Sequence, residues 1–580
     1  MTKILSFLKP YRIAVTVALL LMFTELMVEL LQPFLISKII DDGISQQNLS
    51  VVIQWGGVLV GCSILAFVSG IINSFYASHV SQSFGFDVRE KLYEKVQSFS
   101  FANFNRFPAS SLITRLTNDV TQVQNTVFMC LRIMLRSPLL VVGGLIMSFI
   151  VHARLALLLL LAVPVLLVFL FWAMNKAGKL FRSVQQKLDA VNSVIQENLA
   201  GMRLIKAFLR QNHEIKRFAG TSQELKDKTM SVLRFTEATM PFVLLLMNVC
   251  IMAILWVGSM QVQTSGASVG EVVAIINYAT RMTMALSMFT MIIMNFSRAK
   301  ASASRITEVL DSDGDLVDGE GSRSFGEIGE GRVVFDSVSF QYPESAAPTL
   351  HNISFEVKPG ETVAIMGATG SGKSSLFQLI PRLYDVTGGA IYIDDTDIRR
   401  LTMEQLRQQI GFVPQEALLF TGTVKENIAW GKADATMDEI VEAARRAQIH
   451  ETIMRLPNQY DTMLGQKGVN LSGGQRQRLS IARALVRKPK IVMLDDSTSA
   501  LDTKTEAKLL AALREYPCTL FMITQKMTAA LSADTIMLLE DGKLLAKGSH
   551  EELWEHSSLY RRIYQSQFGE ERSKHAQGID

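Results

Sequence analysis

Hydrophobic residues gather in six long stretches in the first half of the chain. A helix that crosses about 30 Å of hydrocarbon needs roughly 20 apolar residues at ~1.5 Å each. Each stretch meets that length and reads as a membrane-spanning helix. The six predicted spans are residues 13–40, 51–77, 129–151, 155–174, 240–260 and 272–296.

The polar connections between these stretches alternate in charge. Basic residues crowd the second and fourth connections, among them Arg89, Lys95, Lys206 and Arg234. The other three connections together hold one basic residue, Arg154. Because Lys and Arg are enriched on the cytoplasmic side of membranes, we predict a multi-pass protein of the plasma or inner membrane with both chain ends in the cytoplasm.

The two basic connections are long but do not resemble loops. They contain segments with apolar residues at helical spacing, such as VREKLYEKVQSF and SVQQKLDAVNSVIQENLAGMRLIKAFLRQ. The membrane helices are therefore predicted to continue well into the cytoplasm.

The composition changes after residue 310. Residues 311–331 are rich in Asp, Gly and Ser, which is typical of a linker. Beyond them, strand-like runs such as VVFDSVSF, ETVAIMG and IVMLD alternate with helical stretches, which indicates an α/β domain. We predict a helical membrane domain over residues 1–310, a linker over 311–331, an α/β domain over 332–568 and a tail over 569–580.

Composition supports a membrane protein and excludes some other classes. Of the 580 residues, 48% are hydrophobic and 19% are charged, against roughly 25% charged in soluble domains. A net charge of +4 gives no electrostatic argument for a nucleic-acid partner. The four cysteines lie far apart and form no CxxC pair, so neither disulfides nor a zinc site is expected.

One motif in the α/β region points to phosphate binding. The run ETVAIMGATGSGKSSLFQLI reads as a strand, a Gly-x-x-x-x-Gly-Lys-Ser loop and a helix. The glycines let backbone N–H groups surround a phosphate, Lys373 supplies a positive charge to the outer phosphates, and Ser374 can bind Mg²⁺. We predict a P-loop.

A second motif, LSGGQ, starts at Leu471 and precedes the helical run RQRLSIARAL. With the P-loop and six spans before it, the whole chain resembles a half-transporter of the ATP-binding-cassette exporter family. That resemblance implies an all-α six-helix domain followed by an α/β P-loop domain with a small antiparallel β subdomain. The segments RLTNDV and GMRLIKAF also agree with the family, in which they lie in cytoplasmic loops that contact the nucleotide domains.

The resemblance also implies the ligands, ATP and Mg²⁺, and the residues that hold them. Tyr342 matches the aromatic that stacks on adenine, Gln415 the glutamine that senses Mg²⁺, and Asp495 the carboxylate that holds the metal through water. Ser374, Gln415 and Asp495 are the expected metal-site residues. The expected nucleotide contacts are Tyr342, Gly367, Thr369, Gly370, Ser371, Gly372, Lys373, Ser374, Ser375 and Gln415, with Leu471, Ser472, Gly473, Gly474 and Gln475 from the signature.

Two positions depart from the family pattern. Asp496 stands where the family has its catalytic Glu, and Gln525 stands where it has a His that touches the γ-phosphate. Asp is one methylene shorter, and a ~1 Å misplacement can cost about 10²-fold in rate. Gln525 cannot take up a proton. We therefore expect this P-loop site to bind ATP well and hydrolyse it poorly.

The intact signature suggests where hydrolysis occurs. In this family an ATP site forms between the P-loop of one subunit and the LSGGQ of the other. The expected assembly is a heterodimer in which this chain's signature completes a competent site on a homologous partner that carries the Glu and His. The resemblance implies ATP-driven export of hydrophobic or amphipathic compounds, similar to bacterial heterodimeric multidrug exporters.

Other functions remain open at this point. A lipid or lipid-linked flippase, or an ATP-binding regulatory or sensor subunit, would carry the same motifs. In the spans, Glu25, Glu29 and Arg281 are candidates either to contact substrate or to pair with one another. Arg132 and Arg136 are expected near the cytoplasmic end of the third span or to snorkel toward it.

Overall fold

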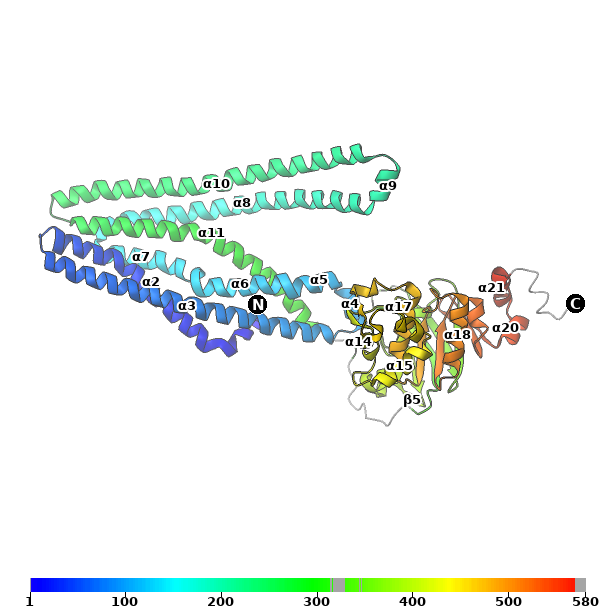
Figure 1. The fold of residues 1–580 in the computed structure, drawn as a ribbon. Helices are drawn as coiled ribbons and strands as arrows, with labels where there is room; N and C mark the ends of the chain where they lie inside the picture. The colour runs from blue at the N-terminus through cyan, green and yellow to red at the C-terminus, as the bar shows by residue number, and fades with distance from the viewer. Residues whose placement is uncertain (1, 313–315, 317–328, 344, 346, 569–580) are drawn as a thin grey trace. The chain divides into compact units, whose positions relative to one another are not determined.

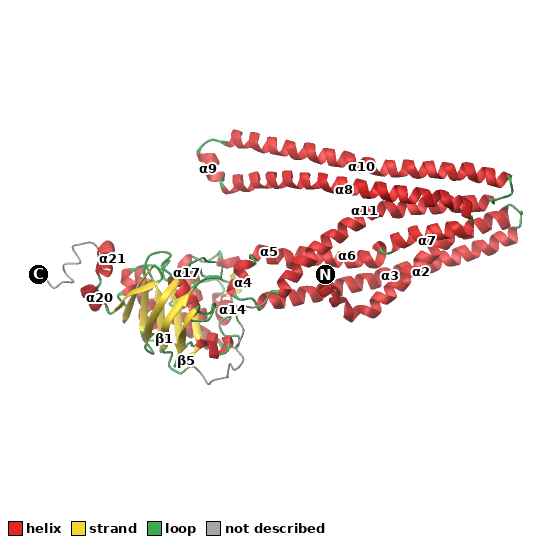
Figure 2. Ribbon diagram, turned by 180° about the vertical axis from the view of Figure 1, so that it is seen from behind, coloured by secondary structure: helices red, strands yellow, loops and turns green. Residues whose placement is uncertain are grey.

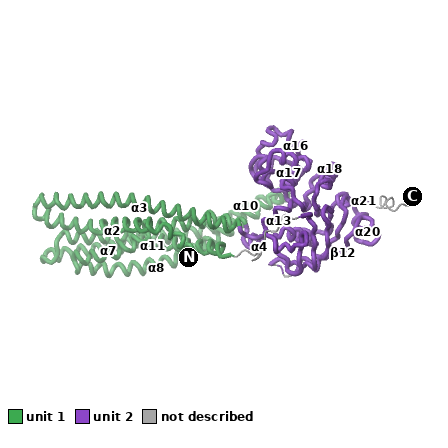
Figure 3. Tube along the Cα trace, turned by 90° about the horizontal axis from the view of Figure 1, so that it is seen from below, with its two compact units in different colours: residues 1–97, 109–312 green, residues 98–108, 313–580 purple. Residues whose placement is uncertain are grey.

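The computed structural model describes residues 2–312, 316, 329–343, 345 and 347–568 (Figure 1). Its contacts divide the chain into two compact units, residues 1–97 with 109–312 and residues 98–108 with 313–580 (Figure 3). Most of the expected linker over 311–331, and the tail over 569–580, lie outside the described residues. The short segment 98–108, which the sequence assigned to the membrane domain, belongs to the second unit.

The first unit is helical (Figure 2). Its described residues contain six helical stretches, each long and apolar enough to cross a membrane, which confirms the predicted number of spans. They run from 42 to 53 residues, so the longest measures about 80 Å at ~1.5 Å per residue. That is well beyond the hydrocarbon thickness, as expected for helices that continue outside it. The stretches are Lys3–Ile44, Leu49–Gln97, Ala109–Val151, Ala153–Ala200, Gln211–Gln263 and Val269–Asp311.

These stretches comprise one or more helices each. The α-helices are α1 (Thr2–Leu5), α2 (Arg12–Lys38), α3 (Leu49–Gln97), α5 (Ala109–Thr114), α6 (Val120–Met129), α7 (Arg136–Val151), α8 (Ala153–Ala200), α9 (Met202–Ala207), α10 (Gln211–Gln263) and α11 (Val269–Asp311). Helix α2 packs along α3, α8 along α10, and α7 along α11. Their apolar core includes Leu26, Leu159, Ile254 and Ile275.

The third stretch is interrupted by two π-helical turns, Arg115–Asp119 and Cys130–Met134. The first turn holds RLTNDV against the end of α11. There the Asp119 carboxylate accepts a hydrogen bond from Ser302 at 2.8 Å and another from the Arg305 Nε at 2.8 Å. This segment, expected to face the nucleotide domain, thus finds these partners inside the membrane unit.

The second unit contains the predicted α/β domain and its antiparallel subdomain. A six-stranded sheet has the order β12-β11-β3-β10-β9-β6, and a four-stranded antiparallel sheet has the order β2-β1-β4-β5. In the larger sheet every pairing is parallel except that of β11 with β12. The described strands are β1 (Val333–Phe340), β2 (Leu350–Val357), β3 (Thr362–Met366), β4 (Gly388–Ile393), β5 (Thr396–Asp397), β6 (Ile410–Val413), β7 (Gly422–Thr423), β8 (Met463–Leu464), β9 (Ile491–Asp495), β10 (Thr519–Ile523), β11 (Thr535–Glu540) and β12 (Lys543–Gly548).

Two apolar cores, one on each face of the six-stranded sheet, hold this unit together. Strands such as β3 and β9 are nearly continuous apolar runs because both faces of a parallel sheet are covered. The helices are α12 (Lys373–Leu379), α13 (Met403–Gln408), α14 (Val424–Ala429), α15 (Met437–Arg446), α16 (His450–Met454), α17 (Gly473–Leu485), α18 (Thr503–Arg514), α19 (Met527–Ala530), α20 (His550–His556) and α21 (Ser558–Phe568).

Helix α4 (Phe101–Arg106) joins the second unit although it lies between the second and third spans in sequence. Ser100 caps it by accepting from the Asn103 N–H. The Asn105 amide donates to the Tyr384 hydroxyl at 3.2 Å, and the ring of Phe101 lies 6.3 Å from that of Tyr384. A connection between spans is therefore anchored on the α/β domain.

Candidate nucleotide-binding site

The carboxyl ends of four parallel strands converge on one cavity. In the register of the sheet, Ile523 of β10 pairs with Ile365 of β3 on one side and with Asp495 of β9 on the other. Ligand sites of open α/β sheets lie at such strand ends. The cavity measures about 220 Å³. Of the predicted residues it is lined by Thr369, Gly370, Gly372, Lys373, Ser374, Ser375, Gln415, Asp495, Asp496 and Gln525.

The P-loop has the backbone that its glycines were predicted to provide. Gly370 and Gly372 have φ values of +85° and +97°, a region that residues with a Cβ enter at a cost. The Lys373 ammonium donates to the loop carbonyls of Gly367 and Ala368 at 3.0 and 2.7 Å. Burial lowers the pKa of Lys373. An incoming phosphate would offer this ammonium a charged acceptor in place of neutral carbonyls.

Hard oxygen ligands lie together beside the loop. The Ser374 hydroxyl donates to the Asp495 carboxylate at 3.4 Å, and Gln415 lines the same cavity. Mg²⁺ prefers few protein oxygens together with substrate phosphates and water, so this donor set fits a magnesium nucleotide. Burial raises the pKa of Asp495, and the neighbouring Asp496 carboxylate raises it further.

Asp496, which lines the cavity, has a left-handed backbone. Its φ is +45°, and its N–H donates to the Ile523 carbonyl at 3.1 Å. Asp and Asn tolerate this left-handed region better than Glu does. Burial raises the pKa of Asp496, while Lys526 acts in the opposite direction. The carboxylate thus stands in the cavity, on a short side chain and in a restrained backbone.

Tyr342 lies beside the cavity but is not among the residues that line it. Its hydroxyl is 2.9 Å from the Ser375 hydroxyl and donates to Gln378 at 3.2 Å. Its ring meets the ring of Tyr384 edge-on, with centroids 5.2 Å apart. The predicted adenine-stacking residue is therefore bonded to the P-loop helix and contacts the same tyrosine that holds α4.

The signature residues 471–475 are not among the residues that line this cavity. The Ser472 hydroxyl accepts from the Gln475 N–H, and the Gln475 side chain accepts from the Ser472 N–H, forming a capping box that starts α17. A Cβ on Gly474 would lie 3.0 Å from the Ala500 carbonyl oxygen. The glycine thus lets the signature pack against the segment that follows Asp496.

Sequence reasoning missed several residues of this site. Thr349 and Ile523 also line the cavity. The Gln567 side chain, from the last described helix, donates to the Gln525 carbonyl at 2.7 Å and accepts from the Met527 N–H at 2.8 Å. No motif marks Gln567, because its role depends on where α21 folds back.

In the membrane unit the charged residues pair with one another. Arg136 bonds to Glu25 at 2.5 Å and to Glu29 at 2.6 Å, and Arg281 lies 3.7 Å from Glu29. Arg132 donates to the Gly70 carbonyl at 3.0 Å. Arg132 and Arg136 thus have acidic and carbonyl partners inside the bundle. Their expected place near the cytoplasmic end of the third span, or snorkelling toward it, stays a prediction.

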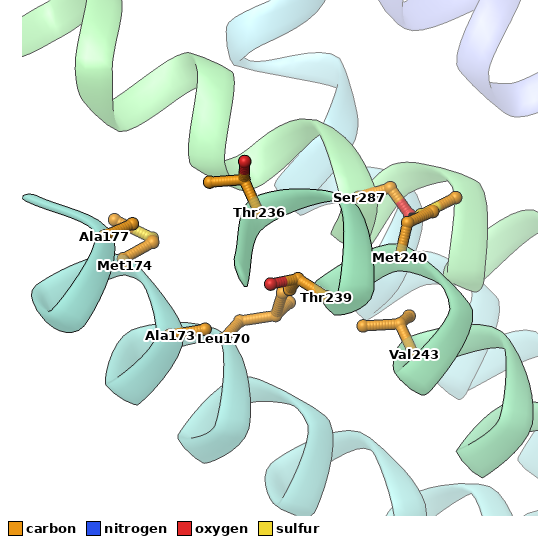
Figure 4. Close-up of a pocket in the computed structure, with 9 residues that line it drawn as sticks. All are labelled: Leu170, Ala173, Met174, Ala177, Thr236, Thr239, Met240, Val243 and Ser287. Carbon is orange, nitrogen blue, oxygen red and sulfur yellow. Dashed lines mark hydrogen bonds between the residues drawn. The ribbon is translucent and has the colours of Figure 1, made fainter. Parts of the chain in front are cut away.

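An apolar pocket of about 190 Å³ lies between α8, α10 and α11 (Figure 4). Its hydroxyl groups are already hydrogen-bonded: Thr236 and Thr239 donate to the carbonyls of Val232 and Phe235 at 3.0 Å, and Ser287 donates to the Thr283 carbonyl at 2.8 Å. The pocket thus offers a mainly apolar surface to a ligand. Its lining residues are Leu170, Ala173, Met174, Ala177, Thr236, Thr239, Met240, Val243 and Ser287.

Comparisons with known proteins agree with this geometry. Residues 15–286 match the family model of the ABC transporter transmembrane region, and residues 350–499 match that of the ABC transporter. The chain is 58% identical to the uncharacterized ABC transporter ATP-binding protein YfiB of Bacillus subtilis (strain 168), over 99% of this chain and 100% of the relative. It is 31% identical to the putative multidrug export ATP-binding/permease protein YgaD of the same strain, over 97% and 98%.

A solved structure is also similar. The structure of a bacterial Atm1-family ABC exporter with ATP bound matches with a TM-score of 0.80 and 25% identity, covering 96% of this chain and all of that one. The chain therefore belongs to the ABC transporter family. It is a multi-pass exporter half-transporter with an ABC ATPase domain coupled to transport, and half-transporters of this type dimerise.

Proposed function

We propose that this chain is the ATP-retaining half of a heterodimeric exporter of hydrophobic or amphipathic compounds. Its own P-loop site binds Mg·ATP and hydrolyses it slowly. Its signature, residues 471–475, completes the competent site of a homologous partner that carries the catalytic Glu and His. In this arrangement Mg²⁺ is held by Ser374, Gln415 and Asp495, and the adenine stacks on Tyr342.

The observation that supports this proposal is the composition of one cavity. Lys373, Ser374 and Asp495, which serve binding, line it together with Asp496 and Gln525, which replace the hydrolytic pair. Hydrolysis needs a carboxylate or base within hydrogen-bond reach of the attacking water. The site has the residues needed to bind nucleotide. Asp496 is one methylene shorter than Glu, and Gln525 cannot accept a proton as His can, so the site is suited to holding nucleotide without cleaving it.

The test is to purify the chain alone and together with a co-encoded half-transporter that has Glu and His at these positions. We expect the pair to hydrolyse ATP and to retain about one ATP per complex after turnover, while the chain alone is nearly inactive. A chain that pairs with itself and hydrolyses ATP as fast as the mixed complex would contradict the proposal.

The orientation is part of the same proposal. The basic connections support a cytoplasmic location for both chain ends, where ATP is available. Reporter fusions active only in the cytoplasm should give signal at both ends. Signal from an outward-facing reporter at either end would overturn this orientation.

Substrate assays separate the remaining alternatives. Support for drug export comes from the apolar pocket and from the similarity to a putative multidrug export protein. ATP-dependent movement of an apolar dye by the reconstituted pair is expected. Movement of labelled lipid without dye transport would favour a flippase, and ATP binding without either would favour a sensor.

A further inference from the structure

The charged residues of the membrane unit do not balance. Three guanidinium groups, Arg132, Arg136 and Arg281, meet two carboxylates, Glu25 and Glu29, which leaves one excess positive charge. We call these five residues the arginine cluster. Ionised side chains within spanning segments are costly unless they are paired or functional.

The pairing is also uneven within the cluster. Arg136 makes the hydrogen bonds to both carboxylates. Arg132 and Arg281 approach a carboxylate only at 3.7 Å, and their hydrogen bonds go to neutral oxygens, those of Gly70, Glu29 (main chain) and Gln32. Two arginines therefore keep charge that no carboxylate neutralises at bonding distance. Their side chains remain 26–28% exposed.

Unsatisfied polar atoms accompany this charge. Among the described residues, neither side-chain amide atom of the buried Asn73 has a hydrogen-bond partner. Asn73 is 0% exposed and lies three residues, about one turn, from Gly70, whose carbonyl Arg132 binds. A buried polar group left without a partner typically costs about 1–3 kcal/mol. Such atoms are commonly satisfied by a bound ligand or water.

The local backbone supports the same reading. Arg132 lies in the π-helical turn Cys130–Met134, and such turns are frequent at functional sites because they re-aim side chains. A strictly α-helical segment would give Arg132 a different direction relative to Arg136.

We propose that the arginine cluster binds the anionic headgroup of an amphiphile, a phosphate or carboxylate on an apolar chain. This assignment rests on the proposed export function and names its substrate class. Arg132 and Arg281 contact the anion, while Arg136 positions the two glutamates. An amphiphilic cation meets net repulsion at the same place.

Binding can be measured without ATP, on the full chain with its co-assembled subunit in phosphatidylcholine nanodiscs. Labelled dodecyl phosphate should bind above the empty-nanodisc background and resist displacement by dodecyltrimethylammonium. Arg132→Gln and Arg281→Gln should each weaken binding about 10- to 100-fold, since each removes a charged hydrogen-bond donor from the anion. Arg182→Gln, at an exposed position of α8, is the matched control and should leave binding unchanged.

A variant that is expected to strengthen binding shows that the losses in the arginine variants do not come from misfolding. Glu25→Gln adds one net positive charge and should tighten dodecyl phosphate binding several-fold. Equal binding of the cationic probe, or unchanged affinity in both arginine variants, would overturn the proposal. Because no transport step is involved, loss of ATP-driven export with binding intact would count against the proposed function and not against this site.

The source of the anion is distinguished by lipid composition. If phosphatidylglycerol added to the nanodiscs competes with dodecyl phosphate, the natural ligand is a bilayer lipid. If it does not compete while dodecyl phosphate still binds, the ligand is a single-chain amphiphile. Either result supports an anion site.

Discussion

The Lys526 ammonium lies 3.2 Å from the Glu506 carboxylate and 3.3 Å from the carbonyl oxygens of Thr498 and Leu501. Glu506 is nearly buried, with 4% of its side chain exposed. Lys526 thus joins the segment that begins with Gln525 to the segment that begins with Asp496. Gln525 and Asp496 are the two departures from the family pattern.

Replacing this lysine should destabilise the ATPase domain. Lys526→Met leaves the Glu506 carboxylate buried without its cation, and breaking a buried pair costs about 3–5 kcal/mol, less here because a third of the lysine is exposed. We expect a loss of about 2 kcal/mol, read as a fall of several degrees in the thermal midpoint. Lys526→Met with Glu506→Leu should recover most of it, and no recovery would show that the carboxylate is not the cause.

The raised pKa of Asp495 gives a prediction with a defined sign. A carboxyl whose pKa is raised by folding stabilises the fold below its unfolded pKa of about 3.8, and this contribution is lost as pH rises through the folded value. Without metal and nucleotide at pH 7, Asp495→Asn should therefore raise the thermal midpoint by a few degrees, equivalent to about 1 kcal/mol or less.

Addition of Mg·ATP should reverse that order. The native chain gains stability from the bound ligand, whereas the Asn variant binds the metal weakly and gains little. Thermal scans at pH 5 and pH 7, with and without Mg·ATP, check both parts. A variant less stable than the native chain under metal-free conditions would contradict the burial argument.

The signature serine should matter for the partner's site. In the assembled pair, Ser472→Arg is expected to remove most ATP hydrolysis, because a long cation occupies the place of a phosphate contact. Ser472→Ala loses the same helix cap, worth about 1 kcal/mol, without the added bulk. Steady-state ATPase assays of the two variants separate these effects, and full activity in the Arg variant would argue against a shared site.

Restoring the family residues should restore hydrolysis in this chain's own site. In the Ser472→Arg background, where the partner's site is blocked, Asp496→Glu with Gln525→His should raise the remaining ATPase rate tenfold or more. Each such group typically contributes 10²- to 10⁴-fold, offset in part by strain from Glu at a φ of +45°. A rate unchanged by both substitutions would show that other residues limit this site.

Features that depend on local sequence could be predicted. The apolar runs from residue 13 to residue 296 correctly indicated the spans, and alternating strands and helices indicated the α/β domain. Glycine spacing indicated the phosphate-binding loop, in which Gly370 and Gly372 have a left-handed backbone. These patterns follow from burial and backbone sterics within a few turns of chain.

Features that depend on distant contacts could not be predicted. Helix α4 reads as part of the membrane domain because contacts with residues distant in sequence, such as Tyr384, assign it elsewhere. The pairing of Arg136 with Glu25 and Glu29 depends on how the first and third spans pack. Tyr342 was expected on adenine, and its bond to Ser375 depends on how the two sheets meet.

The Gln567 bridge has a practical consequence for how this protein is prepared. Its side-chain amide bonds to the Gln525 carbonyl and to the Met527 N–H. Gln567 lies one residue before the end of α21. Trimming the chain back past α20, or attaching a rigid fusion partner directly to Phe568, is therefore expected to alter the loop at Gln525, which lines the cavity. Purification handles placed at the amino end avoid this disturbance.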